Sequence, residues 1–236
     1  MSDISKKWND SLRSAVNYFC PDQVMLSETS LIEDGPSALE RATLGKIDLS
    51  IPCQFVLLTA PSAAGKGTIG RILEASGIER VPRTTTRLRR PGEVEGDYHF
   101  VNQDEYDKML AANEFLCPTD FTTSADSCAG IERKVFADAI RSGHHFYIDS
   151  GFGTAIKIKH EPEMSAARFF VVFILPPTFE ELMRRMETRG SMDKETMFKR
   201  LLIAVEHLAQ TVFHADLFVV NDDANRAAIQ ILKLFG

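Results

Sequence analysis

Short apolar runs alternate with amphipathic stretches along the chain from residue 54 onward. The apolar runs predict strands at Phe55–Thr59, Phe146–Asp149, Phe169–Leu175 and Leu217–Val220, and the amphipathic stretches predict helices at Lys66–Ala75 and Phe179–Thr188. Such alternation is typical of an α/β fold in which helices cover a parallel sheet. Ligands of these folds gather at the carboxyl ends of the strands, so we expect the functional residues there.

Residues 1–50 show a different pattern. Helical periodicity extends over residues 8–19, Pro21 and the Gly35-Pro36 pair interrupt it, and a short apolar pattern follows over residues 39–44. No motif in this segment carries chemistry. We interpret residues 1–50 as an N-terminal extension to a domain at 51–236. Binding of a protein partner through this extension is an open alternative.

Small residues surround Lys66 in the segment that follows the first predicted strand. Small side chains let backbone N–H groups approach phosphate oxygens, a helix N-terminus adds positive potential, and a lysine reaches the β- and γ-phosphates. The expected phosphate-binding residues are Ser62, Ala63, Ala64, Gly65, Lys66, Gly67 and Thr68. The alternative is a surface turn of small residues before an amphipathic helix. Ala63 stands where glycine is usual, and alanine at a positive φ carries a steric cost.

Composition narrows the classes of partner. With 236 residues, 44% of them hydrophobic, the chain suffices for one domain and an extension. The net charge of -6 and the pI near 5.6 argue against non-specific nucleic-acid binding. No stretch approaches the roughly 18 apolar residues of a membrane span, and the N-terminus lacks the apolar core of a signal peptide. We therefore expect no nucleic acid, no membrane and a cytoplasmic location.

A second motif lies downstream, over residues 83–101. Together with the phosphate-binding segment it resembles guanylate kinase, whose pattern is matched by Thr85, Thr86, Arg87, Arg90, Gly92, Glu93, Gly96, Tyr98, Phe100 and Val101. The resemblance runs from residue 54 to the C-terminus. It implies an α/β fold of the P-loop NTPase type, a three-layer sandwich with a parallel sheet, a small mixed α+β lobe for the nucleoside monophosphate at about 83–130, and a helical lid at about 185–205.

The resemblance also implies roles for individual residues. Arg87, Arg90 and Tyr98 would hold the phosphate of the acceptor GMP, which suits the guanidinium fork. Lys66 with the lid residues Arg189 and Arg200 would act on the phosphoryl group of ATP. Thr68 and Asp149 would hold Mg²⁺, although Tyr147 replaces the first aspartate of the family's pair.

Three of these features also have interpretations without a catalytic or binding role. The basic segment at 83–90 also fits a solvated loop, and Asp149 also fits a cap beside Ser150 and Gly151. Arg184, next to the lid residue Arg185, is more typical of an ordinary solvated helix residue.

The base-recognition segment departs from the family pattern. Cys117 takes the position of a glutamate that reads the guanine edge, while Asp126 and Cys128 replace a tyrosine and a hydroxyl residue. Arg83 stands where a small hydroxyl residue is usual. A buried guanine donor that lacks a partner costs about 1–3 kcal/mol, so the acceptor stays open at this stage.

Three functions are therefore weighed. The leading hypothesis is ATP- and Mg²⁺-dependent phosphoryl transfer to GMP. The second is a kinase of another phosphorylated acceptor on the same scaffold. The third is a binding module that resembles the guanylate kinase-like domains of scaffold proteins, which typically lose the phosphate-binding lysine and several arginines. Retention of Lys66, Arg87 and Arg200 argues against this third hypothesis.

Overall fold

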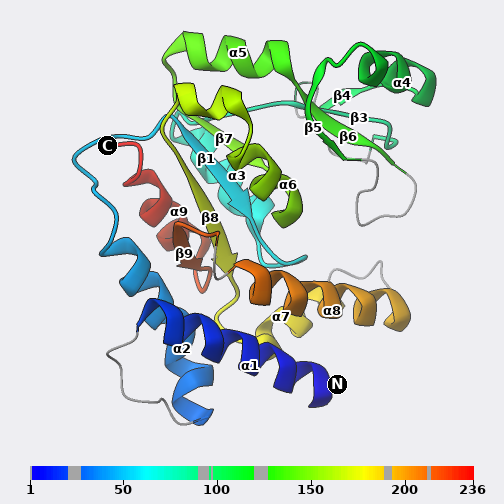
Figure 1. Ribbon diagram of the computed structural model, residues 1–236. Coiled ribbons are helices and arrows are strands. Elements are labelled where there is room, and N and C mark those ends of the chain that lie inside the picture. Colours follow the sequence, from blue (N-terminus) through cyan, green and yellow to red (C-terminus); the bar gives the residue numbers. More distant parts are fainter. Residues whose placement is uncertain are drawn as a thin grey trace.

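The computed structural model describes residues 2–20, 28–89, 96, 98–119, 127–188, 193–211 and 214–236. Its centre is a five-stranded, all-parallel sheet (Figure 1). In spatial order the strands are β2 (Glu79–Arg80), β7 (Phe146–Asp149), β1 (Phe55–Thr59), β8 (Phe169–Leu175) and β9 (Leu217–Val220). The four strands predicted from the apolar runs are confirmed with the predicted bounds.

Alternate side chains of the sheet enter two separate cores, which makes the domain three layers deep. In β1, Val56 and Leu58 face the layer that holds α3 (Lys66–Ala75) and α9 (Ala224–Leu232), whereas Phe55 and Leu57 face α5 (Arg133–Ser142) and α6 (Phe152–Lys159). A short 3-10 helix, η1 (Pro162–Ala166), follows α6. Because β1 is buried on both faces, its sequence is continuously apolar.

A second, mixed sheet forms the lobe at the upper right of Figure 1. Its strand order is β4 (Tyr98–Phe100), β3 (Arg83–Thr85), β6 (Ala129–Glu132) and β5 (Phe115–Thr119). β3 runs parallel to β4 and antiparallel to β6. Helix α4 (Gln103–Ala111) covers one face through Tyr106, whose ring stacks on Phe115 and whose hydroxyl donates to the Ala129 carbonyl.

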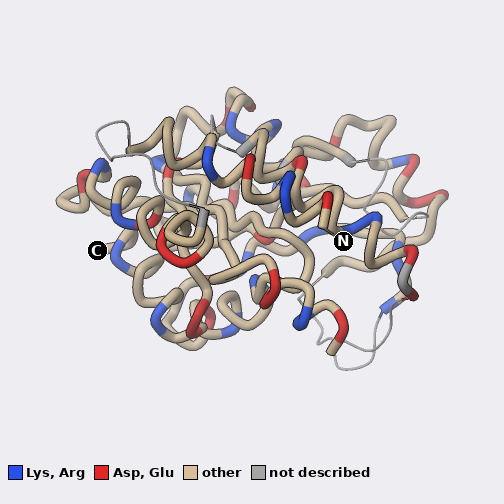
Figure 2. The backbone as a smooth tube through the Cα atoms, turned by 90° about the horizontal axis from the view of Figure 1, so that it is seen from below, with Lys and Arg blue, Asp and Glu red and all other residues tan. Residues whose placement is uncertain are grey.

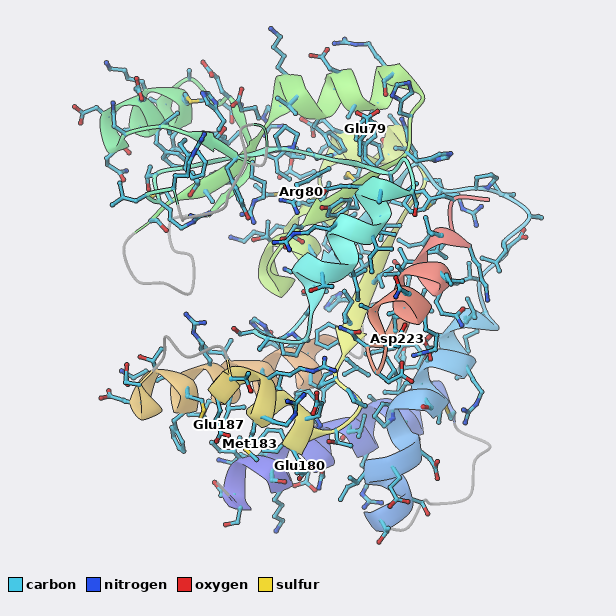
Figure 3. The ribbon with its side chains drawn as sticks, turned by 180° about the vertical axis from the view of Figure 1, so that it is seen from behind. Glu79, Arg80, Glu180, Met183, Glu187 and Asp223 are labelled. Carbon is cyan, nitrogen blue, oxygen red and sulfur yellow. The ribbon has the colours of Figure 1, made fainter. Side chains whose placement is uncertain are left out.

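Two helices, α7 (Phe179–Thr188) and α8 (Lys194–Thr211), occupy the region expected to form the lid. They lie on the same side of the main sheet as the lobe, and the segment after β1 lies between the two (Figure 1). In Figure 3, α7 carries the labels Glu180, Met183 and Glu187.

The N-terminal helices pack onto this region. α1 (Ser2–Phe19) runs beside α8 and packs Trp8 against Phe179, with ring centroids 5.7 Å apart. α2 (Glu28–Leu44) covers the edge strand β9: Thr43 Oγ1 accepts the N–H of Phe218 at 3.1 Å, and Glu40 Oε1 accepts that of Val220 at 3.4 Å. Such capping satisfies the unpaired edge of a sheet.

The predicted bounds of these two helices were wrong. α1 begins at Ser2 rather than at residue 8, because the polar residues of its first turns lie on an exposed face that carries little apolar signal. α2 spans 17 residues and contains Pro36, which was interpreted as a break.

Basic and acidic positions are interspersed along the backbone (Figure 2). No helix in the described part of the chain is long and apolar enough to cross a membrane.

Candidate active site

The segment after β1 adopts a tight loop that ends in α3. Gly65 has φ 96° and Ala63 has φ 67°, so both lie in the left-handed region. A Cβ on Gly65 would come within 2.0 Å of Asn221 Nδ2, so any side chain there would displace the Asn221 amide. Asn221 Nδ2 donates to the Ala64 carbonyl at 2.7 Å and clamps the loop to the end of β9. The first turn of α3 has no side-chain cap, so no capping side chain competes with an anion for the N–H groups at its start.

Lys66 and Asp149 meet at the carboxyl ends of β1 and β7. Lys66 Nζ lies 2.6 Å from Asp149 Oδ1 and donates to the Ser150 carbonyl at 2.7 Å. Burial by itself would raise the pKa of Asp149. The Lys66 ammonium, with help from Arg83 and Arg80, outweighs burial and holds that pKa below its ordinary value.

A carboxylate and hydroxyl groups gather at this edge, which fits Mg²⁺. Thr68 is exposed in the first turn of α3. The hydroxyls of Thr59 and Ser150 are buried at the ends of β1 and β7 and have no hydrogen-bond partner among the described residues. Mg²⁺ prefers one or two carboxylates with waters and phosphate oxygens, and no group of three metal-binding side chains occurs in the described ranges. Asp149 does not cap α6, whose N-cap is Gly151 without a side-chain bond.

The lid helices bring arginines onto the loop. Arg200 Nη1 donates to Ser62 Oγ at 3.2 Å. Arg185 donates to the carbonyls of Asn221 at 2.9 Å and Ala64 at 3.4 Å. Arg184 instead pairs with Glu181 and is 65% exposed, in agreement with the interpretation as a solvated residue. Arg189 lies outside the described residues.

Glu181 anchors these arginines on α7. Hydrogen bonds from Arg184 and Arg185 lower the pKa of the Glu181 carboxyl to about 2. Glu181 therefore stays ionised throughout the physiological range and fixes the direction of the Arg185 side chain toward the loop.

The lobe assembles part of the expected acceptor site. The Arg87 guanidinium lies over the rings of Tyr98 and Phe100, 5.0 and 5.5 Å from their centroids. Pairing of β3 with β4 brings these residues together across the sequence between them. Arg90 lies outside the described residues. Stacking on the aromatic rings fixes the plane of a guanidinium, and the N–H groups at the edge of that plane can bind a phosphate.

The two described residues that replace base-reading positions, Cys117 and Cys128, each contact a different partner. Cys117 is 5% exposed with φ 46°, at an irregularity of β5, and its thiol donates to Glu161 Oε1 at 3.0 Å. Burial and the Glu161 carboxylate raise the pKa of Cys117 to about 12. Cys128 lies 3.8 Å from Gln103 Nε2 on α4. Asp126 lies outside the described residues.

Two residues of the site received no role from the sequence. Asn221 clamps the loop, and its signal was a polar residue directly after a buried strand. Arg83 was noted only as a departure from the family pattern, yet its Nη1 donates to the main-chain carbonyl of Asp149 at 3.1 Å. Arg83 thus joins the lobe to the edge of the main sheet where Lys66 lies.

Comparison with known proteins identifies the family of this chain. The family model described as Guanylate kinase matches residues 53–235. The chain belongs to the guanylate kinase family. It is similar to the guanylate kinase of Trichormus variabilis, with 35% identity over 192 residues that cover 78% of this chain and 90% of that protein. The guanylate kinase of Symbiobacterium thermophilum is 32% identical over 180 residues, or 75% of this chain and 82% of that protein.

The solved structures confirm the guanylate kinase fold. The crystal structure of guanylate kinase from Anaplasma phagocytophilum superposes with a TM-score of 0.57 at 21% identity, over 78% of this chain and 84% of that one. The fold class implied by the resemblance, a parallel sheet with a small mixed lobe, is therefore confirmed. The match to the family begins at residue 53, so α1 and α2 precede the guanylate kinase region.

Proposed function

We propose that this protein is a guanylate kinase that transfers the γ-phosphoryl group of ATP to the phosphate of GMP. The observation that carries the proposal is the assembled donor site: Lys66 paired with Asp149 beneath a strained phosphate-binding loop, with Arg200 of α8 bonded to Ser62 of that loop. Family membership and the guanylate kinase names of the relatives support the choice of GMP.

In this mechanism an acceptor phosphate oxygen attacks the γ-phosphorus as the bond to the β–γ bridging oxygen breaks. Lys66 and Arg200, with Arg189 of the lid, stabilise the charge that spreads over the transferring oxygens. Arg87 and Tyr98, with Arg90, hold the acceptor phosphate in line. No general base is required, because the acceptor phosphate is already ionised.

Mg²⁺ completes the donor site in this proposal. Thr68 and Asp149 would hold it, and it would supply positive charge to the phosphates of ATP. The Lys66 ammonium then exchanges its contact with Asp149 for the ATP phosphates, so the pair seen here is a resting arrangement of the same two groups. The loop residues 62–68 supply backbone N–H groups to the phosphates.

The alternative acceptor keeps one observation in its favour. Cys117 is neutral and its thiol donates to Glu161, so the residue at the position of the family's guanine-reading glutamate offers no carboxylate to the guanine donors. A kinase of another phosphorylated acceptor therefore remains the second candidate. The retained Lys66 and Arg200 contacts disfavour a module that only binds a partner.

The wider organisation is part of the proposal. We assign residues 51–236 to the kinase domain, with the acceptor lobe at about 83–130 and the lid at about 185–205, and residues 1–50 to an extension. A cytoplasmic location suits a nucleotide kinase, and a protein partner at α1 or α2 is compatible with their exposed outer faces.

A coupled assay of ADP release tests the function. The protein is given ATP, Mg²⁺ and in turn GMP, dGMP, AMP, CMP, UMP or ribose phosphates. We expect turnover with GMP that disappears in Lys66→Ala, because that variant loses the cation on the transferring phosphoryl group. Lys7→Ala, which removes an exposed lysine of α1, is the matched control and should keep full turnover. Turnover with another acceptor alone would overturn the choice of GMP, and ATP binding without turnover would overturn the kinase assignment.

A further inference from the structure

Arg83 lies at the junction of the two sheets. The chain leaves the main sheet at Val81, whose N–H donates to the Tyr147 carbonyl at 3.0 Å, and enters the lobe at Arg83, the first residue of β3. Arg83 pairs in register with Tyr98 of the acceptor site, and its Nη1 bonds to the main chain of Asp149. One side chain therefore lies between the donor site and the acceptor lobe.

The guanidinium of Arg83 has donors to spare. Its Nε is buried and has no hydrogen-bond partner among the described residues, and no carboxylate of those residues forms an ion pair with it. Arg80, at the end of β2 and labelled in Figure 3, shows the contrast: its Nε donates to Tyr147 and lies 3.0 Å from Glu74. An unpaired buried donor is destabilising, so its retention next to a substrate site points to a ligand acceptor.

The chemistry of guanine identifies that acceptor. Guanine offers two acceptors on one edge, O6 and N7, and donors at N1 and N2. Arginine binds O6 and N7 bidentately, whereas adenine carries a donor amino group in place of O6. Cys117 is neutral and already bonded to Glu161, so it offers no anion to the guanine donors. Arg87 on Tyr98 already serves the acceptor phosphate, which leaves Arg83 for the base.

We propose that Arg83 is a specificity-determining residue that reads O6 and N7 of the acceptor guanine. This inference rests on the proposed guanylate kinase activity and names how that activity selects its acceptor. Recognition then depends on the acceptor edge of the base and not on its 2-amino group. IMP, which keeps O6 and N7 but lacks the 2-amino group, becomes a good substrate.

The unmodified protein provides the first test. Initial rates are measured with GMP, IMP, AMP and the ribonucleoside monophosphate of 2-aminopurine, which keeps the amino group but lacks O6. We expect comparable kcat/KM for GMP and IMP, and values about 10- to 100-fold lower for the two acceptors without O6. Rejection of IMP together with good use of 2-aminopurine would overturn the proposal, because the donor edge would then be the one recognised.

Variants of Arg83 provide the second test. Arg83→Ser should lower kcat/KM for GMP and IMP about 10- to 100-fold, mainly through KM, while the values for AMP and the KM for ATP stay unchanged. Arg83→Lys keeps the charge without the fork and should recover only part of the loss. Arg89→Ser, in the segment that follows β3 and stacked on Phe100, is the matched control and should keep the preference for GMP.

The outcomes separate a base contact from other roles. An equal loss for GMP and AMP would place Arg83 on the acceptor phosphate, and a loss of ATP-dependent thermal stabilisation would make its role structural; either result overturns the proposal. If the unmodified protein turns over no acceptor, the kinase assignment fails by itself. Calorimetric binding of GMP, IMP and AMP then still tests Arg83, because IMP binding as tightly as GMP supports it and equal binding of AMP overturns it.

Discussion

At the scale of the residue, a few contacts determine the conformation of the proposed donor site. Gly65 has no room for a Cβ beside Asn221, and Ala63 accepts a left-handed φ that costs an L-residue roughly 1–2 kcal/mol. Lys66 and Asp149 neutralise each other at the carboxyl edge of the sheet. The loop therefore keeps its shape without a nucleotide, through contacts that its own neighbours supply.

The Lys66–Asp149 pair predicts a pH dependence of stability. Because the pKa of Asp149 is lower in the folded chain than its unfolded value of about 3.9, the unfolded chain binds more protons below that pH. The contribution is complete above about pH 4 and is lost as the pH falls through the folded pKa. We expect Asp149→Asn to flatten the acid fall of the urea midpoint, measured between pH 7 and the acid limit of folding. Asp10→Asn, an exposed change in α1, should leave it as in the unmodified protein; equal slopes for all three would contradict the prediction.

At the scale of the element, α7 and α8 work as one unit because both carry arginines to the phosphate-binding loop. Arg185 is oriented by Glu181 and bonds to Asn221 and Ala64, while Arg200 bonds to Ser62. The two contacts have different chemistry. Arg185 binds main-chain carbonyls and holds the loop, whereas Arg200 binds a side-chain hydroxyl, a contact that a phosphate oxygen of ATP can replace.

The contact of Arg200 with the loop predicts different effects for changes at Arg200 and at the solvated Arg184. Arg200→Ala should lower kcat about 10³-fold or more with little change in the KM for GMP, because its charge acts on the transferring group. Arg184→Ala, which removes an exposed arginine paired only with Glu181 in the described structure, should leave kcat unchanged. Steady-state kinetics with varied GMP measure both. Unchanged turnover in Arg200→Ala would remove it from the catalytic residues.

At the scale of the whole molecule, α1 and α2 share the core of the kinase. Ile4, Trp8 and Leu12 of α1 belong to the same buried cluster as Leu201 and Ala204 of α8, and α2 caps the edge strand β9. The extension therefore stabilises the lid helices and the sheet edge from outside the region that the family match covers. Its removal would expose apolar surface on both.

The shared core predicts one cooperative unfolding transition. Trp8, the single tryptophan of the chain, is 3% exposed against Phe179 and reports directly on the contact between α1 and α7. We expect its fluorescence and the far-ultraviolet circular dichroism to change together with denaturant, as in a two-state transition. A fluorescence change at lower denaturant than the dichroism would show that the extension unfolds separately.

Much of the donor half could be predicted from local sequence. Six elements form at the predicted bounds: the strands β1, β7, β8 and β9 and the helices α3 and α7. Each is a buried apolar run or a clear amphipathic stretch with its own termination signals. The tight loop between β1 and α3 was predictable for the same reason, because its small residues, Lys66 and Thr68 are contiguous; its binding of phosphate stays a prediction. Such features depend on neighbours within a few positions, and the sequence determines them by itself.

Tertiary structure decided the rest. The direction of the Cys117 thiol depends on an irregularity of β5 and on Glu161, 44 residues away. The spare donors of Arg83 depend on where two sheets meet, and the role of the extension depends on α8 and β9. These are contacts between distant segments, whose register no local pattern encodes. The sequence by itself determined the strand, loop and helix around Lys66, because these segments are contiguous. The packing of the lobe against the main sheet decided which partners Cys117 and Arg83 contact, because those partners lie far away in the sequence.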